Sequence, residues 1–328
     1  MTEHDITFDA MGSHVRLLVG EPAEGLPSAA EAAARAERFV HEFDAALSRF
    51  KPDSELCALN ADERHRVPAS PLLRRAVAAG IAAAERSDGL VDPTLVGEIE
   101  AAGYVRSRAG VGGEPLEEAL AEAPPRRPAR PSPEQRWRAL EVDDEAGVVR
   151  RPPGLRFDTG GTGKGLCADL VAESLRGYRR FIVDCGGDIR IGGASALADP
   201  YEVYVEHPLT GGRAYVLRLG NGGVATSGLN VRVWRGPDGR FSHHLLDPDS
   251  GEPAWTGLVG ATALGDSALE AETLSKMALL SGPEGGREAL AERGGLLVHE
   301  SGRVELVGPL AVAPTIRIPD LAAAGGWR

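Results

Sequence analysis

The second half of the chain alternates short strand patterns with glycine-containing turns, and this alternation limits the possible folds more than any other feature. Runs rich in β-branched and aromatic residues, such as RFIVDC, YEVYVEH and AYVLRL, are each followed by a turn that contains glycine. Strands joined by such short turns pair antiparallel, because a parallel neighbour requires a long crossover. Together with the helices described next, the pattern predicts an α+β fold with mainly antiparallel sheets and packed helices.

Three segments combine a capping residue with apolar residues at helical spacing. The first predicted helix begins at Ser28 and ends before Pro52, and the second begins at Ser70 and ends at Gly89. A third helix begins at Ser267. These helices supply the apolar faces that an antiparallel sheet needs on one side.

A region rich in proline, arginine and glycine interrupts the pattern over residues 107–136. Such a composition does not favour a packed core or a strand ladder, so we expect an exposed excursion there. It divides the chain into an N-terminal α/β part, residues 1–106, and a C-terminal part, residues 137–328. A hairpin is predicted over 138–150, directly before a glycine-rich loop.

Charge and composition exclude several classes of partner. The formal net charge is −12, which argues against broad binding to nucleic acid or to anionic lipid. The three cysteines, Cys57, Cys167 and Cys185, lack CxxC spacing, so neither a disulfide framework nor a zinc site is expected. The N-terminus has no basic segment followed by an apolar one, and no apolar run approaches the roughly 18 residues of a membrane helix. We therefore expect a cytoplasmic protein without membrane insertion.

The glycine-rich loop FDTGGTGKGLCAD, residues 157–169, precedes a predicted helix over 166–176. It is not a P-loop, because Asp158 stands where the first glycine belongs and Gly165 where Ser or Thr belongs. Glycines nevertheless let backbone N–H groups approach an anion, and Lys164 and the helix N-terminus add positive charge. The loop predicts binding of a phosphate or diphosphate. The alternative is a tight strand-to-helix turn whose lysine lies in solvent.

Eight motifs in order resemble those of the ApbE family, the FAD:protein FMN transferases. They are MGS (11–13), LSRFKPDSELCALN (47–60), DGLVDPT (88–94), FDTGGTGKGLCAD (157–169), VDCGGDIRIGG (183–193), ATSG (225–228), HHLLDPDSGEP (243–253) and ALEAETLSKMALLSG (268–282). The resemblance implies an ApbE-like, T-fold-related architecture with the flavin site between the two halves. It also implies that FAD is a substrate whose FMN half is transferred to a Thr or Ser of an acceptor protein, with release of AMP.

The resemblance implies a set of flavin-site residues at matching positions: Met11, Phe50, Asp92, Asp158, Lys164 and Leu246. Phe50 could stack on a ligand ring, or it could continue the apolar face of the first helix. Asp92 could accept hydrogen bonds from the ligand or cap the turn that follows it. Asp158, at the end of a predicted strand, could accept from a ribose or from a ring N–H.

His244 matches the histidine of the family's H-x-x-D-P motif. We expect it to be the general base or to orient the acceptor hydroxyl, although a lone histidine is commonly structural. His243 points to the opposite face if this segment is a strand, which makes it the weaker choice. Asp188 is a further acidic residue that could serve the site or simply form a turn.

The last helix departs from the family pattern. Relatives commonly bind Mg²⁺ with an Asp and a Thr four residues later, together with a backbone carbonyl of the glycine loop. Here those two positions hold Glu272 and Lys276, with Ser275 between them and Gly161 or Gly163 offering the carbonyl. An ammonium cannot bind magnesium. Lys276 is therefore expected either to contact the diphosphate or to pair with Glu272, and the implied Mg²⁺ cofactor depends on which it does.

Two other functions remain open at this stage. With the same site, water could attack in place of a protein hydroxyl, which would make the protein an FAD pyrophosphatase that yields FMN and AMP. A protein that binds FAD without catalysis is the second alternative. The sequence specifies neither the acceptor protein nor the oligomeric state.

Overall fold

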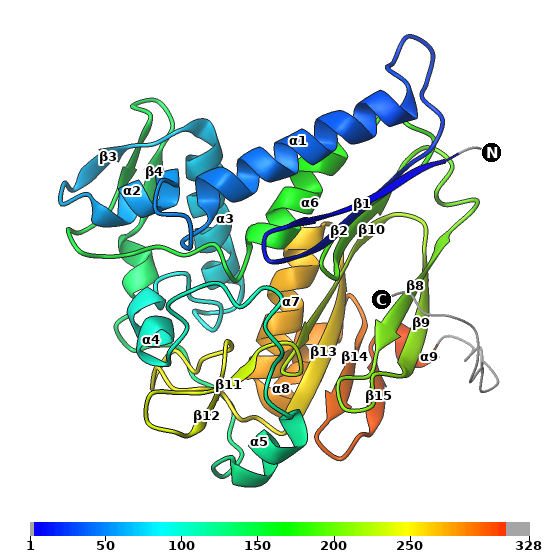
Figure 1. The fold of residues 1–328 in the computed structure, drawn as a ribbon. Coiled ribbons are helices and arrows are strands. Elements are labelled where there is room, and N and C mark those ends of the chain that lie inside the picture. Colours follow the sequence, from blue (N-terminus) through cyan, green and yellow to red (C-terminus); the bar gives the residue numbers. More distant parts are fainter. Residues whose placement is uncertain (1–2, 313–328) are drawn as a thin grey trace.

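The computed structural model describes residues 3–312, and an eight-stranded sheet forms its centre (Figure 1). Its strands, in spatial order, are β1 (His4–Ala10), β2 (Ser13–Val19), β6 (Phe181–Cys185), β7 (Asp188–Gly192), β10 (Gly222–Gly228), β13 (Leu258–Gly265), β14 (Gly295–His299) and β15 (Val304–Val307). Every neighbouring pair is antiparallel. The predicted α+β fold with mainly antiparallel sheets is confirmed.

Helices pack against this sheet and against one another. Helix α1 (Ala29–Leu47) contacts β1 and β2, α6 (Gly163–Ser174) contacts β6 and β7, and α7 (Ala268–Leu280) contacts β10 and β13. Figure 1 shows α6 and α7 side by side, with α1 crossing near them. Helix α8 (Gly282–Leu290) continues the layer over β13 and β14. The residues between these helices and the sheet form the apolar core.

The predicted capping residues begin three helices as expected. The hydroxyl of Ser28 accepts from the N–H of Glu31 at the start of α1, and the Glu31 carboxylate accepts from the N–H of Ser28. Ser70 caps α3 (Pro71–Arg86), and Ser267 caps α7. Helix α1 ends at Leu47, however, so Phe50 follows the helix rather than continuing its apolar face. The chain leaves the helix because Ser48 adopts an extended conformation.

Helix α6 begins at Gly163, three residues earlier than the sequence predicts. Its first turn lies so close to α7 that a Cβ at Gly165 would be 2.8 Å from the backbone of Ala268 and from the carboxylate of Glu272. Only glycine fits at that distance. The glycines of the loop thus allow a helix–helix contact, which sequence spacing does not reveal.

The segment between the first two predicted helices contains a further helix, α2 (Glu55–Ala61), capped by Ser54. The predicted hairpin at 138–150 is present as β4 (Glu141–Asp143) and β5 (Val148–Arg150). These two strands form a small sheet with β3 (Arg66–Pro68).

Residues 107–136 are not an exposed excursion along their whole length. They contain α5 (Leu116–Glu122), in which Leu116 and Ala119 are buried, and they lead into the 3₁₀ helix η1 (Arg136–Ala139). Between these elements, the N–H of Ala129 donates to the carbonyl of Leu280 at 2.9 Å. The proline-rich stretch is held in place because its backbone groups bond to the C-terminal part of the fold.

The predicted division at 106 and 137 does not separate two sheets, because β2 pairs with β6 and the central sheet includes strands from both parts.

The other elements are α4 (Val96–Ala101), α9 (Pro309–Val312) and two hairpins: β8 (Tyr201–Glu206) with β9 (Arg213–Leu219), and β11 (Val233–Arg235) with β12 (Phe241–His243). Over 3–312, none of the helices has both the length and the apolar character that crossing a membrane would require. Residues 313–328 of the predicted C-terminal part lie outside the described residues.

Candidate active site

The glycine-rich loop is a tight turn that leads into α6. The N–H groups of Thr162 and Gly163 both donate to the carbonyl of Thr159, at 3.0 and 2.7 Å. The hydroxyl of Thr159 donates to the carbonyl of Leu47 at the end of α1, at 3.0 Å. These bonds fix the loop against α1 while Gly160 remains exposed. The loop is therefore ordered and accessible at its tip.

Asp158 precedes the glycines of the loop, but the segment before it is not a strand as predicted. Instead, the side chain of Asn60 bonds to both the N–H and the C=O of Phe157, each at 2.8 Å. An amide side chain thus supplies the hydrogen bonds that a neighbouring strand would give. The Asp158 carboxylate accepts from the N–H of Gly160 at 3.2 Å and lies 3.3 Å from Nε of Arg49. Burial raises the pKa of Asp158, although the Arg49 guanidinium opposes that effect.

Lys164 lies in the first turn of α6 and is not simply solvated. Its ammonium is 2.5 Å from Oδ2 of Asp188 and 3.4 Å from the carbonyl of Gly186, and 30% of the side chain is exposed. Burial lowers the pKa of Lys164, but the nearby Asp188 and Glu272 carboxylates outweigh it and the pKa is raised. Lys164 therefore stays charged, at a helix N-terminus where an anion is favoured.

A buried ion pair lies beneath the loop on α7. The ammonium of Lys276 donates to Oε1 of Glu272 at 2.9 Å, and Oε2 of Glu272 accepts from the N–H of Gly165 at 2.8 Å. The Glu272 side chain is fully buried, and burial raises its pKa. A Cβ at Gly161 would lie 4.0 Å from Cδ and Cε of Lys276, so the lysine stem runs beside the loop. Of the two sequence expectations for Lys276, the pairing with Glu272 is present.

These residues do not fit a magnesium site. Both carboxylate oxygens of Glu272 already accept hydrogen bonds, and the hydroxyl of Ser275 bonds to that of Ser227 at 2.8 Å. Within residues 3–312 there is no group of three or more His, Cys, Asp and Glu side chains that could hold a metal ion. Mg²⁺ requires octahedral oxygen ligands. An ammonium about 4 Å from the ion would cost about 4 kcal/mol per unit of metal charge at an effective dielectric constant of about 20.

His244 follows β12 and lies within the electrostatic reach of several cations. Burial lowers its pKa well below the usual value, and His243, Arg232, Lys276 and Lys164 add to the effect. Its Nδ1 is buried and has no hydrogen-bond partner among the described residues. The ring is therefore neutral and has one nitrogen without a protein partner, as a proton acceptor requires.

His243 belongs to the core instead. It is fully buried, meets the ring of Trp255 edge-on at 4.6 Å, and accepts from the N–H of Leu245 through Nδ1 at 3.3 Å. Burial lowers its pKa to about 3. The two adjacent histidines thus have different environments, one in the apolar core and the other near the cations.

Phe50 belongs to an aromatic cluster formed with Tyr104 and Trp234. Ring centroids lie 5.3 Å apart for Phe50 and Tyr104, and 5.4 Å apart for Tyr104 and Trp234. Leu246 packs in the same apolar group. The guanidinium of Arg49 lies 4.1 Å from the Phe50 ring centroid and also pairs with Asp158. The side chains of Phe50, Tyr104, Trp234 and Leu246 thus come together from positions that span more than half of the sequence.

Sequence reasoning identified Phe50 and Leu246 here but missed Arg49, Tyr104, Arg232 and Trp234. Arg232 contacts the hydroxyl of Tyr104 and donates to the carbonyl of Gly12 at 3.3 Å. The adjacency of Arg49 to Phe50 was the one available signal. The other three residues come from segments more than 50 residues away from Phe50, so no local pattern links them to it.

Met11 and Asp92 lie at turns. Met11 and Gly12 form the two-residue turn between β1 and β2, with φ values of 53° and 67°. A methionine in the left-handed backbone conformation is uncommon and strained.

Asp92 accepts from the N–H and hydroxyl of Thr94 through Oδ1, at 2.8 and 2.6 Å, while Oδ2 is buried without a partner among the described residues. Burial raises the pKa of Asp92. One oxygen caps the turn, and the other has no hydrogen-bond partner among the described residues.

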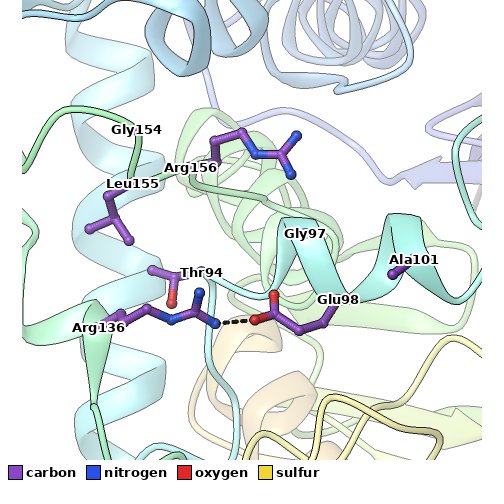
Figure 2. Close-up of a pocket in the computed structure, with 8 residues that line it drawn as sticks. All are labelled: Thr94, Gly97, Glu98, Ala101, Arg136, Gly154, Leu155 and Arg156. Atoms are coloured by element: carbon purple, nitrogen blue, oxygen red, sulfur yellow. Dashed lines mark hydrogen bonds and ion pairs between the residues drawn. The ribbon is translucent and has the colours of Figure 1, made fainter.

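A cavity of about 330 Å³ adjoins these residues without including them (Figure 2). Its lining residues are Thr94, Gly97, Glu98, Ala101, Arg136, Gly154, Leu155 and Arg156. Thr94 and Arg156 are each two residues from a predicted site residue, Asp92 and Asp158 respectively. Figure 2 shows Arg136 and Glu98 paired with each other, and Arg156 pairs with Glu100. Both arginines that line the cavity are therefore paired with carboxylates.

The fold and site together define an α+β protein with a glycine-rich loop at the start of a helix, the ammonium groups of Lys164 and Lys276 beside it, and a neutral histidine. Residues 11–298 match the model of the ApbE family, and the chain belongs to this family.

Curated relatives are similar over most of the chain. The FAD:protein FMN transferase of Haemophilus influenzae is 27% identical over 282 residues, which cover 80% of this chain and 76% of the relative. That of Escherichia coli K12 is 26% identical over 261 residues, covering 78% and 72%.

Solved structures share the fold. The ApbE protein of Thermotoga maritima superposes with a TM-score of 0.75 at 24% identity, covering 93% of this chain and 97% of that one. The flavinyl transferase ApbE of Pseudomonas stutzeri gives a TM-score of 0.72 at 23% identity, covering 93% and 95%. These similarities confirm the predicted ApbE-like architecture.

Proposed function

We propose that this protein is an FAD:protein FMN transferase, which moves FMN from FAD to a Thr or Ser hydroxyl of an acceptor protein and releases AMP. Membership of the ApbE family and the names of the curated relatives support this function. The observation in the site that carries it is the position of Lys164, charged and partly exposed in the first turn of α6 beside the glycine loop. A diphosphate is the part of FAD that such a position favours.

In the proposed reaction, the acceptor oxygen attacks the phosphorus of the FMN half. The bond from that phosphorus to the bridging oxygen breaks, AMP leaves with the bridging oxygen, and the hydroxyl proton passes to a base. The ammonium of Lys164 stabilises the negative charge that develops on the phosphate oxygens. Positioning and charge stabilisation account for most of the catalysis in reactions of this type.

His244 is the proposed base. Its neutral ring can accept the proton, and its buried Nδ1 has no partner among residues 3–312. A diphosphate bound nearby would raise the pKa of His244, because an adjacent negative charge favours the protonated ring. Binding of the substrate thus makes His244 a stronger base at the moment when the proton must move.

The remaining predicted residues are proposed to bind the ring systems of FAD. Phe50 in the aromatic cluster can stack on a flavin or adenine ring, and Leu246 and Met11 can pack against it. The unpartnered Oδ2 of Asp92 and the carboxylate of Asp158 can accept hydrogen bonds from ligand N–H or O–H groups. Magnesium, which the family resemblance implies, has no step in this proposal because the site residues do not fit it.

The experiment that tests the function follows two products. The purified protein is incubated with FAD, with and without a protein extract of the source organism, in EDTA and in millimolar MgCl₂. AMP is measured by chromatography, and newly flavinylated proteins are detected by flavin fluorescence in denaturing gels and by a mass increase of one FMN. AMP together with labelled protein supports transfer. AMP without label indicates the pyrophosphatase, and bound FAD without AMP indicates a carrier.

A cytoplasmic location and the absence of a nucleic-acid partner stay predictions. Cell fractionation with an antibody against the protein tests the location. A mobility-shift assay with duplex DNA and with RNA tests the second prediction, for which the net charge of −12 is the physical reason.

A further inference from the structure

The pair of Glu272 and Lys276 is the feature that the proposed function leaves unexplained. We propose, on the basis of the flavin-transfer function above, that the ammonium of Lys276 takes the place of a divalent metal ion. The diphosphate of FAD would then be held by the two ammonium groups of Lys164 and Lys276, so FAD binding, and any AMP release that follows it, would need no metal.

The position of Lys276 supports this role. Lys276 follows Glu272 by four residues on α7, so both side chains share one face of the helix. The lysine stem runs beside Gly161 of the glycine loop, where a Cβ would be 4.0 Å from Cδ and Cε. The lysine stem therefore lies beside Gly161 and its ammonium bonds to Glu272, two of the residues that the family resemblance assigns to the metal.

The hydrogen bonds of the ammonium leave room for a ligand. Lys276 has three N–H donors, and within residues 3–312 one of them is used, by Oε1 of Glu272 at 2.9 Å. The side chain is 10% exposed, so a small part of it remains accessible to solvent. Glu272 is in turn held by the N–H of Gly165. The carboxylate thus orients the ammonium while two donors remain for phosphate oxygens.

Lysine usage in the chain points in the same direction. The sequence contains three lysines, Lys51, Lys164 and Lys276, among 36 basic residues, and the rest are arginines. Two of the three lie at the glycine loop. An ammonium is a compact point charge, whereas a guanidinium is a broad planar fork. A point charge is therefore the better substitute for a single metal ion.

His244 adds an electrostatic observation. Lys164 and Lys276, together with Arg232, lower the pKa of its ring, so both ammonium groups act on the proposed base. A diphosphate bound by the two lysines would offset that effect, because an adjacent negative charge favours the protonated ring.

The first test needs no variant. FAD binding is measured by quenching of flavin fluorescence in EDTA and again in millimolar MgCl₂. We expect the two dissociation constants to agree within about twofold. If Mg²⁺ does not bind the site, it cannot change the affinity of the protein for FAD. Binding of FAD only in the presence of Mg²⁺ would overturn the inference. Isothermal titration of Mg²⁺ into the FAD complex should give no saturable heat, and a stoichiometric site would equally overturn it.

The second test uses variants. Lys276→Thr should weaken FAD binding in EDTA by about tenfold to a hundredfold, as expected for loss of a charged hydrogen bond. Lys276→Arg should bind less tightly than the native protein but more tightly than Lys276→Thr. The double variant Glu272→Asp/Lys276→Thr should recover FAD binding when Mg²⁺ is added, because it restores the Asp and Thr pair. Lys276→Thr that binds FAD like the native protein in EDTA would contradict the inference.

Lys51→Thr is the matched control, since Lys51 is an exposed lysine that pairs with Asp44 outside the site. Circular dichroism melts identify any variant that fails to fold. In that case the comparison of FAD binding in EDTA and in MgCl₂, made on the native protein, tests the inference by itself. The two proposals fail separately. Metal-independent FAD binding without AMP release would leave the inference standing and overturn the transferase, whereas AMP release that requires Mg²⁺ would do the reverse.

Discussion

The ammonium of Lys276 lies 2.9 Å from Oε1 of Glu272, and both side chains are buried on α7 beneath the glycine loop. The other carboxylate oxygen of Glu272 accepts from the N–H of Gly165 on α6. One carboxylate therefore joins the first turn of the loop helix to the lysine of the neighbouring helix. Burying two charges is favourable only when each finds a partner, so we expect the two residues to act as a unit.

Substitutions at this pair should be strongly non-additive. Lys276→Met leaves the Glu272 charge unpaired, and Glu272→Gln leaves the Lys276 charge unpaired, so each should lower the free energy of unfolding by about 3–5 kcal/mol. The double variant should recover most of that loss because no charge is left alone. Urea unfolding followed by circular dichroism measures all four proteins. Additive losses within about 0.5 kcal/mol would show that the pair does not act as a unit.

His244→Asn should separate catalysis from binding. Loss of the base should lower the rate of AMP release by about 10²- to 10⁴-fold, because general base catalysis contributes that much. The FAD dissociation constant should change far less, since the proposed role of the ring lies in proton transfer. His41→Asn, an exposed histidine on α1, is the control. Parallel losses of FAD affinity and rate in His244→Asn would instead indicate a binding role.

Phe50→Leu should weaken FAD binding without unfolding the protein. Stacking of an aromatic side chain on a nucleobase contributes about 1–3 kcal/mol, so the affinity should fall by about 5- to 150-fold. Phe39→Leu is the matched control, because Phe39 is a partly buried phenylalanine on α1 that packs against the core. Flavin fluorescence measures both. Equal affinities for the two variants would place Phe50 in the core alone.

The free energy of unfolding should decrease as the pH is lowered, because of His243. Its pKa is about 3 in the folded protein, against 6.5 for the exposed ring, so the unfolded chain binds the extra proton between these values. Stability from the neutral ring is therefore complete above pH 6.5 and is lost on acidification, by about 1.4 kcal/mol per pH unit, until the pH reaches the folded value. His243→Asn keeps an acceptor for Leu245 and should reduce this slope; the pKa of His244 is also lowered, so part of the slope remains. Urea midpoints measured from pH 7 to pH 4 test it, and an unchanged slope would contradict the assignment.

The sequence by itself determined several local elements and the family. Ser28, Ser70 and Ser267 cap helices where predicted, and the strands that follow glycine turns pair antiparallel. These features are readable because a cap bonds to a backbone N–H three residues away and a short turn brings adjacent strands together. The order of motifs also predicted the family, since each motif is a short local pattern.

Only the tertiary structure decided how the site is assembled. Gly165 and Glu272 are more than 100 residues apart, yet their contact sets where α6 begins and where the carboxylate points. Tyr104 and Trp234 join Phe50 in the same way, and Lys276 pairs inward and does not lie in solvent. Sequence spacing describes which residues share one helix face or one strand edge. Contacts between elements depend on how those faces pack, and packing is a property of the whole fold.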